Sequence, residues 1–330
     1  MSFIAYRISE ENGATVARFE NLTLNDLDAG EVVIRTHYSS VNYKDALAAT
    51  GTGKVIRRFP CVGGIDVAGI VESSSDQRFK TGDKVLVTGY DMGVAHDGGF
   101  SEVVRVPADW VVSLPEGLSL SEAMALGTAG FTAALAIHRL EQNELTPESG
   151  KVIVTGATGG VSSLAIQMLA QSGYHVVAMT SKDHEHQYLA QLGAREIISP
   201  NAIDPNNKRP LEKGLWAGAL DSVGGATLAW LTRTMQQDGA IASYGNAGGV
   251  ELSTSVFPFI LRGVKLLGVD SAATKMPLRK MIWQRLATDL HPMHFADMVQ
   301  RIHFNDLPQV FQPMVQGKSR GRVVVEIASE

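Results

Sequence analysis

A glycine-rich turn between an apolar run and a helix constrains the fold of this chain more than any other feature. Residues 151–155 (KVIVT) have the composition of a short strand, residues 156–160 (GATGG) follow at once, and residues 161–171 have the composition of a helix. Such a turn brings backbone N–H groups and the positive end of the helix dipole to one point, which suits a pyrophosphate. The alternative is an ordinary turn between a strand and a helix.

The turn matches the spacing G-x-G-x-x-G with small substitutes at the outer places. The three places hold Ala157, Gly159 and Ser162, so the glycine that lets phosphates approach the backbone is present. The residues predicted to contact the diphosphate are Thr158, Gly159, Gly160 and Val161.

Strands and helices alternate after this turn. A second strand and helix are predicted at residues 175–180 (HVVAMT) and 183–192. Further segments of both kinds continue as far as residue 269. This alternation predicts a parallel, doubly wound sheet. Its cofactor domain is predicted to span residues 126–270.

The first third of the chain is rich in short strand-like runs. Val and Ile are frequent in these runs, and Gly, Pro and Asp bound them, which predicts a barrel-like β domain. The runs are residues 31–36, 67–72, 84–88 and 101–106, with a short helix at residues 42–50. A similar strand near the end, at residues 321–327, suggests that the chain returns to this domain. We therefore predict one domain from residues 1–125 and 271–330.

The tip of the second parallel strand indicates which nicotinamide dinucleotide would bind. An acidic residue there would hold the ribose diol of NAD, but this tip carries Thr180, Ser181 and Lys182. Arg195 opens the next strand and is expected close to the same edge. Charge-assisted bonds from such groups would hold a 2′-phosphate, so the sequence favours NADPH. The alternative is that Lys182 and Arg195 are solvated surface cations.

Charge and cysteine content exclude several classes of protein. The formal net charge of −5 argues against a general nucleic-acid binder. One cysteine, Cys61, allows neither an internal disulfide nor a site of several thiolates. No run of 18–20 apolar residues stands out, and the N-terminal residues lack the layout of a signal peptide. We expect a cytoplasmic protein without a membrane or nucleic-acid partner.

Several motifs together resemble the medium-chain dehydrogenase/reductase superfamily over essentially the whole chain. They are VNYKD (41–45), PCVGGIDVAG (60–69), TGDKV (81–85), GGFSE (98–102) and the turn at 156–161. The combination is most similar to the zinc-free, quinone-oxidoreductase-like branch. VNYKDALAATG and VTGATGGV are similar to the bacterial group of acryloyl-CoA reductases, long labelled quinone oxidoreductases. The resemblance implies an α/β protein with a GroES-like catalytic domain and a Rossmann domain for NADPH.

The resemblance also bears on metal binding. Zinc-dependent members of the superfamily carry a Cys and a His-Glu pair at places that here hold Asn42, Ile65 and Asp66. Catalytic zinc needs about three good protein ligands, and this set does not supply them. We therefore expect no metal.

Without zinc, the resemblance implies hydride transfer from NADPH to the activated C=C of an enoyl thioester, with acryloyl-CoA as the leading substrate. The enolate formed needs a hydrogen-bond donor and a proton. Tyr43 is the candidate for both the hydroxyl and a cofactor contact, with Asn42 beside it, and Asp45 and Asp66 would orient neighbouring groups. The alternatives are a pocket-shaping aromatic at Tyr43 and structural carboxylates at Asp45 and Asp66.

Further contacts follow from the same resemblance and from position. Ser222, Val223, Gly245 and Asn246 follow strands at their carboxyl ends, where ligands of such sheets bind. An Arg near the C-terminus, Arg320 or Arg322, is expected to reach the cofactor. The basic cluster Lys54, Arg57 and Arg58 is a candidate for the nucleotide end of CoA, or else a solvated face.

Residues 264–269 form an apolar potential edge strand, which favours a homodimer. Two other functions remain open: an NADPH:quinone oxidoreductase on the same scaffold, and a non-catalytic NADPH-binding sensor or structural protein.

Overall fold

The computed structural model describes residues 2–204, 207, 209–293 and 296–328. The chain divides into unit 1 (Met1–Ala129, Ser271–Ala287 and Met298–Glu330) and unit 2 (Gly130–Asp270 and Thr288–Asp297). The sequence placed these boundaries at residues 125 and 271 and assigned all of 271–330 to the first domain. Thr288–Asp297 instead belongs to unit 2, where the Gln171 side chain donates to the His291 carbonyl at 2.9 Å.

Two sheets form unit 1. The smaller has the strand order β2-β1-β4, and the larger has the order β15-β16-β3-β5-β6-β8, with β7 paired to β3. The last strand pairs antiparallel with β3, so the chain returns to its first unit as expected. The strands are β1 (Ser2–Glu11), β2 (Ala14–Thr23), β3 (Val32–Val41), β4 (Cys61–Val62), β5 (Asp66–Ser74), β6 (Lys84–Thr88), β7 (Val103–Val106), β8 (Val112–Ser113), β15 (Val299–His303) and β16 (Arg322–Glu326).

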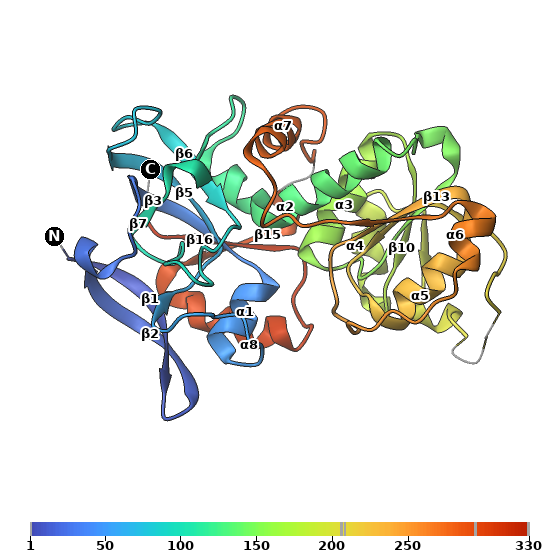
Figure 1. Cartoon of the computed structure of the whole chain (residues 1–330), viewed down its shortest axis with the longest axis horizontal. Coiled ribbons are helices and arrows are strands. Elements are labelled where there is room, and N and C mark those ends of the chain that lie inside the picture. Colours follow the sequence, from blue (N-terminus) through green and yellow to red (C-terminus); the bar gives the residue numbers. More distant parts are fainter. Residues whose placement is uncertain (1, 205–206, 208, 294–295, 329–330) are drawn as a thin grey trace. The chain divides into compact units, whose positions relative to one another are not determined.

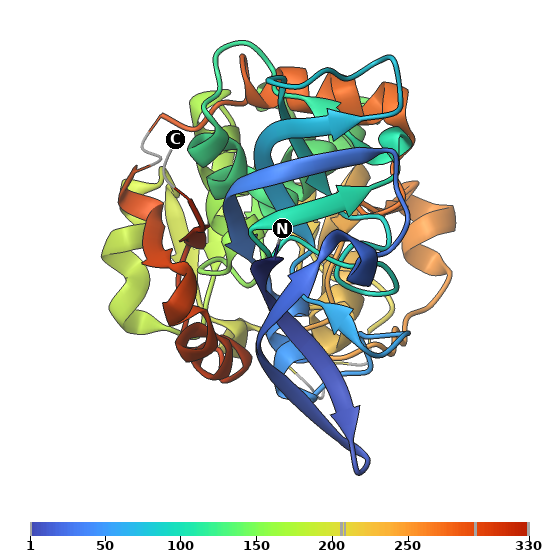
Figure 2. The same ribbon diagram turned by 90° about the vertical axis from the view of Figure 1, so that its left-hand side faces the viewer.

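Helices α1 (Tyr43–Thr50), α7 (Met276–Leu286) and α8 (Leu307–Val315) complete unit 1, and α8 packs against α1. Figure 2 shows the hairpin of β1 and β2 in dark blue, with its far end extending from the rest of this unit. This hairpin, β15 and α8 were not predicted from the sequence.

Unit 2 contains the expected parallel sheet, of which β10 and β13 are labelled in Figure 1. Its strand order is β11-β10-β9-β12-β13-β14. Because the order reverses between β9 and β12, right-handed crossovers place α3 and α4 on one face and α5 and α6 on the other. The strands are β9 (Lys151–Val154), β10 (His175–Met179), β11 (Glu196–Ile198), β12 (Trp216–Asp221), β13 (Met235–Ser243) and β14 (Lys265–Gly268). The helices are α3 (Gly160–Gln171), α4 (His186–Gln191), α5 (Gly225–Thr234) and α6 (Phe257–Arg262). The predicted fold class is confirmed.

Helix α2 (Leu120–Glu141) has two parts that meet at a kink at Gly127. It is long and apolar enough to cross a membrane, but most of it is buried inside the protein, as in the core helices of many globular proteins. Gly127 has φ 51° and ψ −154°, a conformation that is essentially restricted to glycine. A Cβ there would lie 2.5 Å from Asp66 Oδ2 and 2.6 Å from Ser40 Oγ.

We therefore expect Gly127→Ala to lower the free energy of unfolding by at least about 3 kcal/mol, because backbone strain and steric overlap act together. Urea denaturation of the whole chain, followed by tryptophan fluorescence, measures the loss. Gly317→Ala is the matched control, since Gly317 also has a positive φ but a Cβ on it would meet no atom within 4 Å. It should cost about 1 kcal/mol. Equal losses in the two variants would contradict the role given to crowding at Gly127.

Candidate active site

The predicted phosphate turn lies at the carboxyl end of β9. Gly156 has φ 56°, and a Cβ on it would lie 2.4 Å from Ser222 Oγ. The Ala157 N–H donates to the Met179 carbonyl, and Gly159 is the residue immediately before α3. The first amides of a helix have no intrahelical acceptor, so Gly160 and Val161 can offer their N–H groups to an anion. The local backbone therefore fits a diphosphate.

The loops after β12 and β13 meet beside this turn. Thr155 Oγ1 donates to Asp221 Oδ1 at 2.7 Å and accepts from the Ser222 N–H, while the Gly224 N–H donates to Asp221 Oδ2. Burial raises the pKa of Asp221, and these hydrogen bonds oppose the rise. A Cβ on Gly245 would lie 2.4 Å from the Ser222 carbonyl oxygen. The structure thus brings the predicted residues of all three loops together.

The remaining members of this set are the exposed Asn246, the half-buried Val223 and Thr158, whose side chain is buried. Val223 accepts the Gly248 N–H at its carbonyl.

The end of β10 offers hydroxyl groups and a cation, as predicted. Thr180 Oγ1 accepts the Lys182 N–H at 3.1 Å, and Ser181 is exposed. Asp183 comes one residue later, at the start of a short 3₁₀ turn, and is also exposed. Hydroxyl and ammonium groups at this place suit a 2′-phosphate better than a ribose diol.

Arg195 is not at this end of the sheet, and that part of the prediction is wrong. Its N–H donates to the Val176 carbonyl, whereas the Thr180 N–H donates to the Ile198 carbonyl. Because β10 and β11 are parallel, a residue that opens β11 lies at the amino edge. The three residues from Arg195 to Ile198 span roughly 10 Å along the strand.

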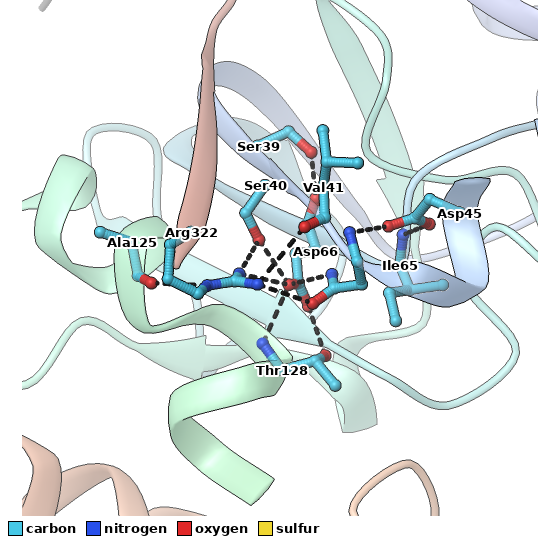
Figure 3. A network of polar contacts seen from close by, with 10 residues as sticks. Ser39, Ser40, Val41, Asp45, Ile65, Asp66, Ala125, Thr128 and Arg322 are labelled. Atoms are coloured by element: carbon cyan, nitrogen blue, oxygen red, sulfur yellow. Dashed lines mark hydrogen bonds and ion pairs between the residues drawn. The ribbon is translucent and has the colours of Figure 1, made fainter. Parts of the chain in front are cut away.

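The polar centre of unit 1 is the buried carboxylate of Asp66 (Figure 3). It accepts from Ser40 Oγ at 2.6 Å, from Asn42 Nδ2 at 2.7 Å, and from both the N–H and the hydroxyl of Thr128, at 2.9 and 2.5 Å. The Arg322 guanidinium, 3% exposed, lies 4.0 Å away and also donates to Ser40 Oγ and Asn42 Oδ1. Burial lowers the pKa of Arg322, and the neighbouring carboxylates oppose this effect.

These contacts change the roles expected for several candidates. Both ends of the Asn42 amide are engaged, with Asp66 and Arg322, and no contact joins Asn42 to the Tyr43 hydroxyl among the described residues. Tyr43 begins α1 and is 47% exposed. Asp45 accepts the N–H groups of Asn42 and Ile65 at 2.8 and 3.0 Å. Asp45 and Asp66 therefore have the geometry of carboxylates that fix local backbone.

Of the two candidate arginines near the C-terminus, Arg322 is buried and Arg320 is exposed. Ser40 and Tyr244 belong to these polar networks but were not predicted from the sequence. Each is a hydroxyl residue close to the carboxyl end of an apolar strand, and that position is the signal that was overlooked.

The residues at positions 42, 65 and 66 do not fit a zinc ion. Ile65 has no donor atom, the Asn42 amide is engaged at both ends, and the Asp66 carboxylate already faces a guanidinium. Across the part of the chain that the structure describes, no cluster of three His, Cys, Asp or Glu side chains is placed to hold a metal.

The predicted CoA cluster is more nearly neutral than its sequence suggests. Arg57 pairs with Asp91, and Arg58 pairs with Asp28 and lies 3.9 Å from Asp97. Lys54 is exposed. Two of the three positive charges are therefore matched by carboxylates, which weakens their attraction for phosphates.

Asp45 makes the folding stability depend on pH. Burial, together with repulsion from Asp66, raises its pKa to about 7, while the unfolded chain has a pKa of about 3.9. The folded state holds the extra proton between these values, so this contribution to stability is full below pH 4 and is lost as the pH rises to 7.

The destabilisation caused by Asp45→Asn should therefore be smaller at pH 8 than at pH 5, by up to about 3 kcal/mol, because the folded-state pKa of about 7 lies two units above the lower pH. Urea denaturation at both pH values measures the difference. Asp26→Asn removes a similar cap at an exposed carboxylate whose pKa is lowered by hydrogen bonds from Thr23. Its effect should be the same at pH 5 and pH 8. A constant effect for Asp45→Asn as well would refute the pH dependence.

Comparisons with known proteins agree with this architecture. Residues 28–116 match the family of the alcohol dehydrogenase GroES-like domain, and residues 160–287 match the family named zinc-binding dehydrogenase. Acrylyl-CoA reductase AcuI of Ruegeria pomeroyi is 47% identical over 318 residues, covering 96% of each chain. YhfP of Bacillus subtilis, provisionally named a quinone oxidoreductase, is 46% identical over 97% of each chain.

Solved structures show the same likeness. The yhdH oxidoreductase of Salmonella enterica in complex with NADP has a TM-score of 0.96 and 45% identity, covering 98% of this chain and 100% of that chain. The Bacillus subtilis yhfP structure with NAD bound has a TM-score of 0.96 and 44% identity, covering 99% of this chain and 100% of that chain. The chain belongs to the medium-chain dehydrogenase/reductase superfamily, in the group that contains the acrylyl-CoA reductases.

Proposed function

We propose that this chain is an NADPH-dependent reductase of the activated C=C bond of enoyl thioesters, and that it converts acryloyl-CoA to propanoyl-CoA. The observation that carries the proposal is the 47% identity to an acrylyl-CoA reductase over 96% of both chains. The metal-incompatible residues at positions 42, 65 and 66 agree with it, because reduction of an alkene by a nicotinamide needs no Lewis acid to hold an alkoxide.

The proposed cofactor site uses the backbone of unit 2. The amides of Gly160 and Val161 would bind the diphosphate, and Thr180, Ser181 and Lys182 would surround the 2′-phosphate. A relative of high similarity was crystallised with NADP and another with NAD, so the choice between them has to come from the β10 tip.

Bound NADPH supplies a hydride to the β-carbon of the enoyl thioester, and one proton is needed at the α-carbon. The Tyr43 hydroxyl is the proposed donor to the enolate because it is exposed at the start of α1. Asn42, Asp45 and Asp66 act on it indirectly, by fixing the backbone from which Tyr43 projects.

The second candidate function is an NADPH:quinone oxidoreductase, and the name given to YhfP favours it. Initial rates with acryloyl-CoA, crotonyl-CoA and a benzoquinone, each with NADPH and with NADH, separate the two. We expect acryloyl-CoA with NADPH to be fastest and NADPH to bind at least tenfold more tightly than NADH. Tenfold faster turnover of the quinone would reverse the ranking, and equal affinity for NADH would refute the proposed 2′-phosphate site.

The same assay tests the proton donor. Tyr43→Phe should lower kcat by about 100-fold, because general acid catalysis contributes roughly that much. Tyr174→Phe is the matched control, since the Tyr174 hydroxyl donates to the Leu145 carbonyl at the other end of β10. Wild-type turnover in Tyr43→Phe would leave Tyr43 as a packing residue.

We also propose a homodimer joined through unit 2. β14 is an edge strand that pairs with β13. Exposed apolar residues gather on β14 and on α6 and the segment before it: Val250, Leu252, Val256, Phe257, Ile260, Leu261 and Leu266. An edge strand with such neighbours favours pairing with a second copy.

Light scattering after size exclusion should give twice the mass of 35.4 kDa for the wild type and the mass of one chain for a variant with Ile260→Lys and Leu266→Lys. Leu24→Lys, at an exposed apolar residue of unit 1, should leave the dimer intact. A monomeric wild type would refute the dimer.

A cytoplasmic location is proposed because a single cysteine, buried as Cys61, suits a reducing compartment. Immunoblots of separated cytoplasmic and membrane fractions check it.

A further inference from the structure

Ser162 occupies the third place of the G-x-G-x-x-G spacing, where a glycine would allow close packing of helix on strand. It is the third residue of α3 and is 1% exposed. Its hydroxyl donates to the Thr155 carbonyl at 2.9 Å, directly after β9. The Ser162 side chain therefore links the first turn of α3 to the end of β9, the strand that precedes this helix.

Two serine hydroxyls donate to the carbonyl oxygen of Thr155. Ser222 Oγ also donates to the Thr155 carbonyl at 2.9 Å, so both lone pairs of that oxygen are used. Each serine hydroxyl has one proton, and both protons are therefore committed. The Tyr244 hydroxyl lies 3.3 Å from Ser162 Oγ. Ser162 Oγ also lies 3.4 Å from Ser222 Oγ, so its proton has two acceptors other than the phenol oxygen, and we therefore assign Tyr244 as the donor to Ser162 in the contact between them.

The other groups around this cluster have little room to move. The Tyr244 N–H donates to the Asp221 carbonyl at 3.0 Å, which fixes the end of β13 against the end of β12. Gly156 and Gly245 approach Ser222 so closely that a Cβ on either would lie 2.4 Å from one of its oxygen atoms. Ser162, Ser222 and Tyr244 thus link three loops at the carboxyl edge of the sheet, where ligands of such sheets bind.

We propose that the hydrogen bond from Tyr244 to Ser162 holds the first turn of α3 in position for the diphosphate of NADPH, which makes Tyr244 a positioning residue for the cofactor. This rests on the proposed function. The Tyr244 hydroxyl compensates for the absence of glycine at position 162. Its hydrogen bond restrains the first turn of α3, which closer packing of helix on strand would otherwise do. Ser162 does not act as the donor in this hydrogen bond, since its own proton is used in the bond to the Thr155 carbonyl.

The Tyr244 phenol stays protonated at neutral pH. Burial raises the pKa of its phenol, with Asp221 adding to the rise and Ser162 opposing it. The phenol therefore keeps its proton at neutral pH, and Ser162 receives the hydrogen bond throughout the pH range in which the enzyme would work.

The test is a double-mutant cycle read out as NADPH affinity. The Kd for NADPH is measured by cofactor fluorescence for the wild type, Tyr244→Phe, Ser162→Ala and the double variant, and thermal unfolding is followed without cofactor. Phenylalanine keeps the ring of Tyr244, and alanine keeps the Cβ of Ser162, so each change removes only a hydroxyl. Tyr174→Phe serves again as control, because it removes a phenol hydrogen bond at the opposite edge of the same sheet.

We expect Tyr244→Phe to raise the Kd three- to tenfold and the double variant to match Ser162→Ala, because the second change removes nothing more once the partner is gone. Tyr174→Phe should lower the unfolding temperature without changing the Kd. A Kd within twofold of wild type in Tyr244→Phe, or effects that multiply in the double variant, overturns the positioning role alone. A wild type that does not bind NADPH overturns the proposed function and this inference together.

Discussion

The buried charge of Asp66 is the constraint on which unit 1 depends. A carboxylate taken out of water costs several kcal/mol unless hydrogen bonds and an opposite charge compensate it. Ser40 and Asn42 from the end of β3, Thr128 from the kink of α2 and Arg322 from β16 supply that compensation. These groups are as much as 282 residues apart in sequence, so satisfying one charge brings the two ends of the chain into one unit.

The same network sets the chemistry open to the site. A guanidinium meets the carboxylate, and the amide beside it is engaged at both ends, so no set of donors is left to hold a metal ion at these positions. Charge that develops on a substrate must then be stabilised by hydroxyl and amide hydrogen bonds. In the proposed reaction the exposed Tyr43, on a backbone fixed by Asp45 and Asn42, would provide such a hydroxyl.

Features governed by local sequence could be predicted, and those governed by distant partners could not. The turn at Gly156 and the alternation of strands and helices depend on nearby residues, and the structure has them where the pattern indicated. The hairpin of β1 and β2 was not predicted, because charged residues interrupt the apolar pattern of its two strands. Arg57 and Arg58 looked like a basic cluster because their partners, Asp91 and Asp28, lie 34 and 30 residues away. The error at Arg195 was avoidable, since a residue that opens a parallel strand lies at the amino edge.

The phosphate turn shows how a close-packed site accepts a departure from its usual sequence. At Gly156 a side chain is excluded, because Ser222 fills the space that a Cβ would need. At position 162 a side chain is tolerated, because the Ser162 hydroxyl donates to the Thr155 carbonyl, which lies close to the first turn of α3. Serine at this position also places an oxygen lone pair of Ser162 Oγ in the protein interior. A buried lone pair without a hydrogen-bond donor would lower the free energy of unfolding. The Tyr244 hydroxyl lies 3.3 Å from this oxygen and is placed to donate to it, so we expect residues 162 and 244 to change together.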